Sequence, residues 1–502
     1  MQPENLNQQD MYKIKKRLRR LWVVMMLTGF CSLSASAADH KIVVIADPHV
    51  MPASLLTDPD NPYWTAYIEG SRKLIDYSQS LFDQAMAEIA IIKPELVLIV
   101  GDLTKDGEQD SHDYIKERLD ELKAAGIQTL VIPGNHDIGP SEDAIVFGEI
   151  TTEAPTIDAE DFAALYADYG YGETSEREET SLTYACEPID GLVVIGIDTG
   201  TEGDLSETTL EWVCEKAAEA QAAGTQVIAM MHHPLIPHIT GGDTFVASVS
   251  VTDFAYVRHR LAESGLSVVF TGHFHISDIA KDWNDDLTKT IYDVTTGALC
   301  TYPCDYRIVT LNPELTSMTI ETESITSAGA PLDGDEEFTT SIAKDRLYSV
   351  TTSILKAQIM DRILGDQTGT LAELLAATVA ENLAPRLAEA YIYHAEGNEQ
   401  ENPDAQALLS QLDMLLSSYP TFQDMTNSML EDKSNYGDPE REDQTDDRTL
   451  TIALPKTTAI SQVNMDATAL ADDWHSLDGR KLEGKPRRKG VYVNGGKKVV
   501  VR

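Results

Sequence analysis

The sequence has 502 residues, of which 42% are hydrophobic and 24% charged; this composition is typical of a soluble globular protein of two or three domains and excludes collagen-like, largely disordered and polytopic membrane proteins. Its formal net charge is −43, because the sequence has 82 acidic residues and 39 basic ones. Since so acidic a surface repels phosphate backbones, we predict no general nucleic-acid binding, whereas a small anionic substrate is compatible with a site where a bound metal reverses the local charge.

Residues 1–37 have the organisation of a secretory signal peptide. A basic run between Lys13 and Arg20 precedes an apolar stretch, and Ala35-Ser36-Ala37 offers a small-residue cleavage site. The apolar stretch, of about eleven residues, is too short to span a bilayer. We therefore predict an exported protein, periplasmic, cell-surface or secreted, without a transmembrane helix in its mature form. A buried N-terminal helix is the alternative.

Export would place the cysteines that follow the cleavage site in an oxidising compartment. These are Cys186, Cys214, Cys300 and Cys304. Four thiols in such a compartment indicate disulfides, for which three connectivities exist. Cys300 and Cys304 are close enough in sequence to pair locally, but the sequence does not fix the pairing.

Residues 38–335 alternate short β-branched runs with longer helical periods, which predicts a layered α/β catalytic domain. We expect buried strands over residues 41–46, 96–100, 129–132, 192–197, 227–231 and 266–271. We expect helices over residues 71–92, 111–125, 207–223 and 252–264. Further strands over residues 291–295, 306–311 and 317–321 would extend or close the sheets.

The remainder of the chain divides into three parts of different texture. Residues 336–430 carry Ala, Leu and Glu at helical spacing, which predicts an all-α accessory or cap domain of four or five helices, including helices over residues 370–383 and 404–416. Residues 431–449 are acidic and interrupted by Gly437 and Pro439, as in a linker. Residues 450–502 predict a small β module with a hairpin turn at Asn494-Gly495-Gly496.

Five polar motifs directly follow predicted strands. They are Asp47-Pro48-His49, Gly101-Asp102, Gly134-Asn135-His136-Asp137, His232-His233-Pro234 and Gly272-His273-Phe274-His275. Because sites in α/β sheets form at the carboxyl ends of strands, we expect these side chains to meet. Aspartate, asparagine and histidine suit divalent Mn, Fe or Zn. Each motif alone is compatible with a turn or a helix cap, so the prediction of a metal site rests on all five occurring in order.

This ordered set resembles the calcineurin-like metallophosphoesterase superfamily over residues 41–321. The resemblance implies a β-sandwich flanked by helices, with two metal ions bridged by a carboxylate and a hydroxide. It implies the following ligands: Asp47, His49 and His275 for the first metal, Asn135, His232 and His273 for the second, and Asp102 as the bridge. It also implies that His136 assists the leaving group and that Asp137 orients His136.

Two departures narrow the resemblance. Lys105 stands where purple acid phosphatases have a tyrosine, and no Arg-Gly pair follows Asp102 as in the protein Ser/Thr phosphatases. The set is most similar to exported class III cyclic-nucleotide phosphodiesterases with a helical C-terminal cap. This similarity implies phosphodiester hydrolysis, with cyclic nucleotides among the substrates, by attack of a metal-bridging hydroxide. An extracytoplasmic phosphomonoesterase that scavenges phosphate and a non-catalytic surface binding module are the alternatives.

The C-terminal module resembles the type IX-like sorting modules of exported Bacteroidetes-type proteins. The matching segments are residues 476–480, 490–493 and 496–500. The resemblance implies a contact with sorting machinery, and an ordinary terminal hairpin is the alternative. The sequence specifies neither the oligomeric state nor the role of the helical domain.

Overall fold

The computed structural model describes residues 38–240, 249–284, 288–365, 369–417, 419–431, 446–455, 474–476, 490–494 and 497–501. The predicted signal peptide, residues 1–37, lies outside this part of the chain, as do residues 432–445 of the predicted linker. Within the described part, no helix combines the length and the apolar composition that crossing a membrane requires.

The first of two large sheets contains the first three predicted strands side by side and parallel. Three later strands extend it in antiparallel fashion beyond β1. The continuous apolar runs of β1 and β2 are buried, as expected of parallel strands covered on both faces. In spatial order the strands are β17 (Thr449–Ala453), β14 (Ser317–Ser324), β13 (Asp305–Leu311), β1 (His40–Ile45), β2 (Leu96–Val100) and β3 (Gln128–Ile132).

The second sheet has a parallel centre, β8 to β9 to β10 to β12, with antiparallel strands at both edges. It contacts the first sheet where β2 meets β9 and β3 meets β8, so one apolar core fills the space between the two layers. In spatial order its strands are β11 (Asp278–Trp283), β12 (Thr290–Thr295), β10 (Val268–Thr271), β9 (Gln226–Met231), β8 (Leu192–Ile197), β7 (Tyr184–Ile189) and β6 (Glu176–Arg177).

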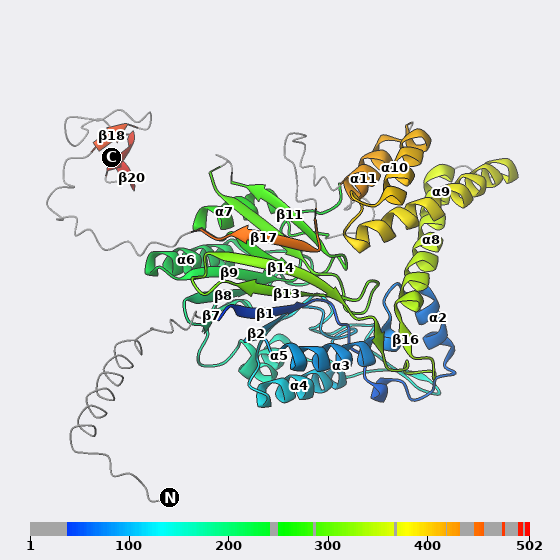
Figure 1. Cartoon of the computed structure of the whole chain (residues 1–502), viewed down its shortest axis with the longest axis horizontal. Helices are drawn as coiled ribbons and strands as arrows, with labels where there is room; N and C mark the ends of the chain where they lie inside the picture. The colour runs from blue at the N-terminus through cyan, green and yellow to red at the C-terminus, as the bar shows by residue number, and fades with distance from the viewer. Residues whose placement is uncertain are drawn as a thin grey trace, which may run out of the picture. The chain divides into compact units, whose positions relative to one another are not determined.

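Helices cover the outer faces of both sheets. α3 and α4 lie together beside the β1 and β2 end of the first sheet, and α6 lies along β8 and β9 of the second (Figure 1). α3 buries the apolar stripe Leu81, Phe82, Ala85 and Ile89, which is the spacing of a helix with one face in the core. The helices are α2 (Pro62–Gly70), α3 (Ile75–Ile92), α4 (Gln109–Ala124), α5 (Ala159–Leu165), α6 (Glu207–Ala223) and α7 (Phe254–Ser264).

Every strand and helix expected up to residue 321 is present, and the layered α/β prediction is confirmed. The structure adds elements that the sequence pattern did not indicate. Besides α2, α5, β6, β7 and β11, they are the 3₁₀ turns η1 (Ala53–Leu55) and η2 (Ala167–Tyr169) and the short strands β4 (Ile145–Phe147), β5 (Thr151–Glu153), β15 (Ser327–Ala328) and β16 (Phe338–Thr339).

The predicted helical region consists of α8 (Thr340–Leu364), α9 (Thr370–Glu396), α10 (Pro403–Leu416) and α11 (Pro420–Leu430). α8 packs along α9, and α10 packs against α11, around a separate apolar cluster. Polar contacts join this region to the sheets. The Arg346 guanidinium on α8 donates to both carboxylate oxygens of Asp76 at 2.5 and 2.8 Å, and the Tyr302 hydroxyl donates to Glu396 on α9 at 2.6 Å.

The boundary that we predicted at residue 450 needs correction. Residues 449–453 form β17, which pairs antiparallel with β14 at the edge of the first sheet. Ile452 is buried there while its neighbours along the strand are exposed, so the alternating sequence suits an edge strand. The later hairpin is confirmed: β19 (Gly490–Asn494) pairs with β20 (Lys497–Val501), and β18 (Trp474–Ser476) adds to β19.

The expected disulfides are absent: Cys186, Cys214, Cys300 and Cys304 are all free thiols. Cys186 lies on β7 and Cys214 on α6, and each packs separately against the apolar core. Cys300 and Cys304 are both buried, and burial raises the pKa of the Cys300 thiol to about 12. These cysteines therefore act as small apolar side chains in the core.

Candidate metal centre

The five predicted motifs meet at the carboxyl ends of five strands, three in one sheet and two in the other. Asp47 follows β1, Asp102 follows β2 and Asn135 follows β3, whereas His232 follows β9 and His273 follows β10. Both sheets thus contribute residues to a single site at the carboxyl ends of these strands. This is the arrangement that strand-end placement predicted.

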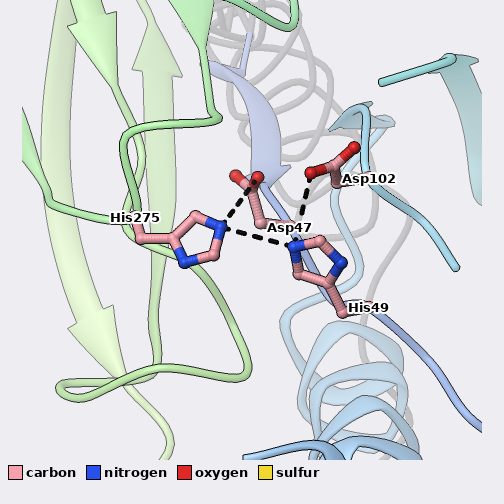
Figure 2. A group of neighbouring side chains, drawn as sticks. All are labelled: Asp47, His49, Asp102 and His275. Carbon is pink, nitrogen blue, oxygen red and sulfur yellow. Dashed lines mark hydrogen bonds and ion pairs between the residues drawn. The ribbon is translucent and has the colours of Figure 1, made fainter. Parts of the chain in front are cut away.

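The first group of candidate ligands comprises Asp47, His49, Asp102 and His275, whose ligand atoms all lie within 4.8 Å of one another. Figure 2 shows these four side chains pointing toward one another, with Asp47 and His49 coming from the same loop after β1. The Nε2 atom of His49 lies 3.3 Å from Oδ2 of Asp102 and 3.3 Å from Nε2 of His275. The Nε2 atom of His275 lies 3.4 Å from Oδ1 of Asp47.

The second group comprises Asp102, His232 and His273. The Nε2 atom of His232 lies 3.4 Å from Oδ1 of Asp102, the oxygen that does not face His49. The side-chain oxygen of Asn135 lies 3.0 Å from both His232 Nε2 and His273 Nδ1. Asp102 therefore belongs to both groups and turns one carboxylate oxygen toward each.

Two of the four imidazoles, those of His49 and His232, are oriented as metal ligands require. Nδ1 of His49 donates to the Thr104 carbonyl at 3.2 Å, and Nδ1 of His232 donates to the Val100 carbonyl at 2.9 Å. Since a carbonyl only accepts, the proton resides on Nδ1 and the lone pair of Nε2 points into the site. His49 and His232 are 0% exposed and Asp102 1%, so the donor atoms are also shielded from bulk water. This donor set fits two divalent metal ions.

The ligand loops carry unusual backbone strain. Five of the predicted ligands adopt a left-handed backbone conformation, which costs a non-glycine residue about 1–3 kcal/mol. They are Asp47 (φ 48°), His49 (φ 42°), Asp102 (φ 49°), His273 (φ 63°) and His275 (φ 64°). Such strain is maintained only where surrounding structure enforces it, and its concentration here marks a functional site.

Glycine precedes two of these ligands because no side chain fits. A Cβ on Gly101, whose φ is +91°, would lie 2.6 Å from Nδ1 of His232. A Cβ on Gly272 would lie 2.6 Å from a carboxylate oxygen of Asp47. Both glycines allow the loops of the two sheets to approach until their ligands meet.

The role we predicted for Asp137 needs correction. Its carboxylate accepts hydrogen bonds from the backbone N–H groups of Gly134, Leu103 and Thr104, at 2.7 to 3.1 Å, rather than contacting the His136 ring. The turn that contains Asp137 folds back over the β2 loop, so this side chain holds the loop in place. Burial, and after it the nearby Asp102 carboxylate, raise the pKa of Asp137 to about 6.

The carboxylate that contacts His136 is Asp106, which our sequence analysis missed. Its Oδ1 atom lies 2.7 Å from Nδ1 of His136. Burial alone would lower the pKa of His136, but the carboxylates of Asp102 and Asp106 outweigh it and raise that pKa above its ordinary value. His136 is therefore poised to hold a proton at the metal groups, and Asp106 fixes its ring.

A lysine beside the site was also missed. The Lys73 ammonium, on the loop between α2 and α3, lies 3.3 Å from Nε2 of His136 and 3.5 Å from Nδ1 of His49. Arg72 adjoins it in sequence and lines the same cavity. No local motif marks Lys73, because the loop joins the site only through the packing of α3 against the sheet.

Comparison with known proteins identifies this architecture. Residues 40–277 match the model of the family described as calcineurin-like phosphoesterase. We call these residues the phosphoesterase domain. The layered metallophosphoesterase fold with an added helical region, as predicted, is thereby confirmed.

Two curated proteins are similar in sequence to the phosphoesterase domain. A probable cyclic nucleotide phosphodiesterase of Rhodococcus erythropolis is 26% identical over 247 residues, which cover 48% of this chain and 66% of that protein. A probable glycerophosphodiester phosphodiesterase of Arcobacter nitrofigilis is 29% identical over 175 residues, which cover 34% and 51%. The chain thus spans just under two thirds and about half of these relatives' lengths.

A solved dimetal phosphatase from Danio rerio is similar in structure, with 13% identity and a TM-score of 0.39. The match covers 61% of this chain and all of the other.

A cavity of about 410 Å³ opens beside the metal groups of the phosphoesterase domain. Asp102, Asn135, His136, His273 and His275 line part of it. Side chains of α8, α9 and α11 line another part. The cavity therefore lies between the phosphoesterase domain and the helical region, and a molecule bound there would contact both.

The helical region also contacts the metal-ligand loop directly. Phe274, between His273 and His275 in sequence, packs against the apolar cluster of α8–α11. Its ring centroid lies 5.8 Å from that of His238 and 6.3 Å from that of His394 on α9. His233, the neighbour of His232, instead lies 2.8 Å from the Thr199 hydroxyl through Nδ1.

Proposed function

We propose that the chain is a two-metal phosphodiesterase. The observation that carries the proposal is the convergence of two ligand groups on Asp102, with the His136–Asp106 pair beside them. Asp47, His49 and His275 would hold one ion, and Asn135, His232 and His273 the other, with Asp102 between them. When bound, two divalent ions polarise phosphoryl oxygens and lower the pKa of water, which is the chemistry that phosphate-ester hydrolysis needs.

The protein's own groups complete the reaction. His136 lines the cavity and its Nδ1 is held by Asp106, so Nε2, which lies 3.3 Å from the Lys73 ammonium, would protonate the oxygen of the departing group. A raised pKa suits this role, because it increases the fraction of His136 that carries a proton at a given pH. Lys73 and Arg72 would bind the negative oxygens of the phosphate, which offsets the acidity of the chain as a whole.

The phosphodiester is favoured over the phosphomonoester by two observations. Both curated relatives are named as probable phosphodiesterases. The cavity also extends from the metal groups to the helical region, so a second ester substituent has a place to bind. Cyclic nucleotides and glycerophosphodiesters are the substrate classes that the relatives' names suggest.

Hydrolysis of bis-(p-nitrophenyl) phosphate beside p-nitrophenyl phosphate, on manganese-reconstituted protein, tests the proposal. We expect a higher kcat/KM for the diester. The reverse preference would replace the proposal with a phosphate-scavenging monoesterase. Two bound metal ions per chain with hydrolysis of neither ester would favour a binding module instead. Parallel reconstitution with iron and zinc would identify the most active metal.

We further propose that the protein is exported by residues 1–37 and engages sorting machinery through its C-terminal β module. The charged, apolar and small-residue order of residues 1–37 supports export. The N-terminal sequence of the protein recovered from outside the cytoplasm tests this, and it should begin at Ala38. Deletion of residues 474–502 should then leave the protein exported but change its final location.

A further inference from the structure

From the apolar part of the cavity lining, we infer that the substrate is an amphiphilic phosphodiester in which one ester group carries an alkyl or acyl chain. The inference rests on the proposed phosphodiesterase activity and specifies its substrate class. Its central observation is the apolar wall, formed by residues of three helices: Ile354 and Leu355 of α8, Leu387 of α9, and Met425 and Met429 of α11.

The cavity lining has two chemically different parts. Arg72, Lys73 and the metal groups form one part, which suits an anionic phosphate. On the helical side, the cavity lining includes no carboxylate, ammonium, guanidinium or imidazole among the described residues. A ligand that contacts both parts of the lining therefore needs a charged group and an apolar group.

Hydrogen-bonding groups are few along the apolar wall. Among the described residues that line the helical side, Thr351, Gln358 and Tyr391 have polar side-chain atoms. The Arg72 guanidinium carbon lies 5.9 Å from the ring centroid of Tyr391, so this tyrosine lies beside the cationic part of the lining. Thr351 and Gln358 are then the polar side chains left among the described residues of the helical side, so most of that surface offers a nucleobase edge no hydrogen bond. An apolar chain needs none.

The phosphoesterase domain continues the apolar wall. Ile239 and Phe274 line the cavity and pack with the cluster of the helical region. Ile354 keeps 39% of its surface exposed, so apolar surface is available to a ligand in the cavity. The two methionines add flexible, polarisable side chains, which adapt to a mobile chain better than to one rigid shape. The cavity volume, about 410 Å³, is within the range of small-molecule sites.

A series of p-nitrophenyl alkyl phosphates tests the inference, because only the alkyl group changes from methyl through butyl to octyl. Concentrations stay below those at which octyl esters form micelles. Each fully buried methylene is worth up to about a fourfold gain, so even partial burial predicts a kcat/KM at least about tenfold higher for the octyl than for the methyl ester. A flat series, or a cyclic nucleotide cleaved with a higher kcat/KM than the octyl ester, would overturn the inference.

A matched pair of variants locates the effect. Ile354→Gln should lower the octyl-to-methyl ratio of kcat/KM at least about threefold, because it places an amide in the apolar wall. Leu374→Gln is the control, since Leu374 on α9 is also an exposed apolar residue but does not line the cavity. Equal ratios in Ile354→Gln and the wild type would place the alkyl chain elsewhere and overturn the inference.

Calorimetric binding of methylphosphonate and octylphosphonate to the manganese-loaded protein separates the two proposals. Tighter binding of octylphosphonate, with a more negative heat-capacity change, would support the apolar wall whether or not esters are cleaved. If octylphosphonate bound but no ester were hydrolysed, the proposed phosphodiesterase activity would be overturned, whereas the inference of an amphiphilic ligand would stand. If the methyl ester were hydrolysed but both phosphonates bound equally tightly, the phosphodiesterase activity would stand and the inference of an amphiphilic substrate would be overturned.

Discussion

Nδ1 of His136 lies 2.7 Å from Oδ1 of Asp106, a carboxylate from the neighbouring strand-end loop. The Asp102 carboxylate and, after it, this contact raise the pKa of His136, so Asp106→Asn should lower that pKa. We expect kcat to fall about 10- to 100-fold with little change in KM. If His136 is the proton donor, the alkaline limb of the kcat profile should also move to lower pH.

The control for Asp106→Asn is Asp110→Asn, because the exposed Asp110 carboxylate accepts from the Ser54 hydroxyl at 2.8 Å and does not line the cavity. This control should behave as the wild type. An unchanged alkaline limb in Asp106→Asn would remove His136 as the proton donor.

Asp102 turns one carboxylate oxygen toward each candidate metal group. Asp102→Asn should therefore weaken both sites together, lowering the bound metal below two ions per chain and kcat/KM at least about 100-fold. Metal analysis by mass spectrometry after gel filtration measures the first effect. Asp60→Asn, at an exposed position, is the control. A variant that retained two ions and full activity would contradict the bridging position.

Lys73 places a positive charge 3.3 Å from the proposed proton donor. Lys73→Gln should raise KM for a phosphodiester about tenfold, because a hydrogen-bonded charge to the phosphate is lost. The effect should shrink at high salt, where the wild type also loses affinity. Lys93→Gln, an exposed lysine at the end of α3, should leave KM unchanged. Equal KM values in the two variants would exclude Lys73 from phosphate binding.

His238 is buried between two carboxylates, with Nδ1 3.3 Å from Asp278 and Nε2 3.2 Å from Asp293. Burial lowers its pKa, but these carboxylates outweigh burial and raise it to about 10. Because the pKa is raised on folding, the stabilisation is complete below about pH 6.5 and is lost as the pH rises toward 10. The free energy of unfolding should fall by at most about 1.4 kcal/mol for each pH unit in this window.

Thermal unfolding at pH 7, 8 and 9 measures this loss. His238→Gln should be less stable than the wild type at pH 7 and should show a flatter dependence on pH. His259→Gln, a half-buried histidine of α7, should keep the slope of the wild type. A wild-type slope in His238→Gln would assign the dependence to other groups.

The sequence predicts that these motif residues come together, because they lie in short motifs at strand ends, where local sequence fixes both strand and turn. It fails where a contact joins distant segments. Asp137 adjoins His136 in sequence, yet the turn directs it to the backbone of Leu103 and Thr104, and Asp106 replaces it. Lys73 reaches the centre only through tertiary packing.

The same distinction explains the corrections to the fold. β17 pairs with β14, more than a hundred residues earlier, and nothing within residues 449–453 specifies that partner. Likewise, apolar burial of Cys300 and Cys304 depends on the core around them rather than on their spacing. By contrast, the runs of β1, β2 and β9 are so uniformly apolar that each indicates a central strand by itself.

Phe274 stands between His273 and His275 and packs into the helical region. One residue thus serves as part of the ligand loop and as part of a second core, so the chain is not two interchangeable modules. Excising α8–α11 would leave an aromatic ring in water next to two strained ligands. Any recombination that exchanged this region for another would have to supply a new apolar partner for Phe274. We therefore expect the helices and the loop of residues 272–275 to be inherited together.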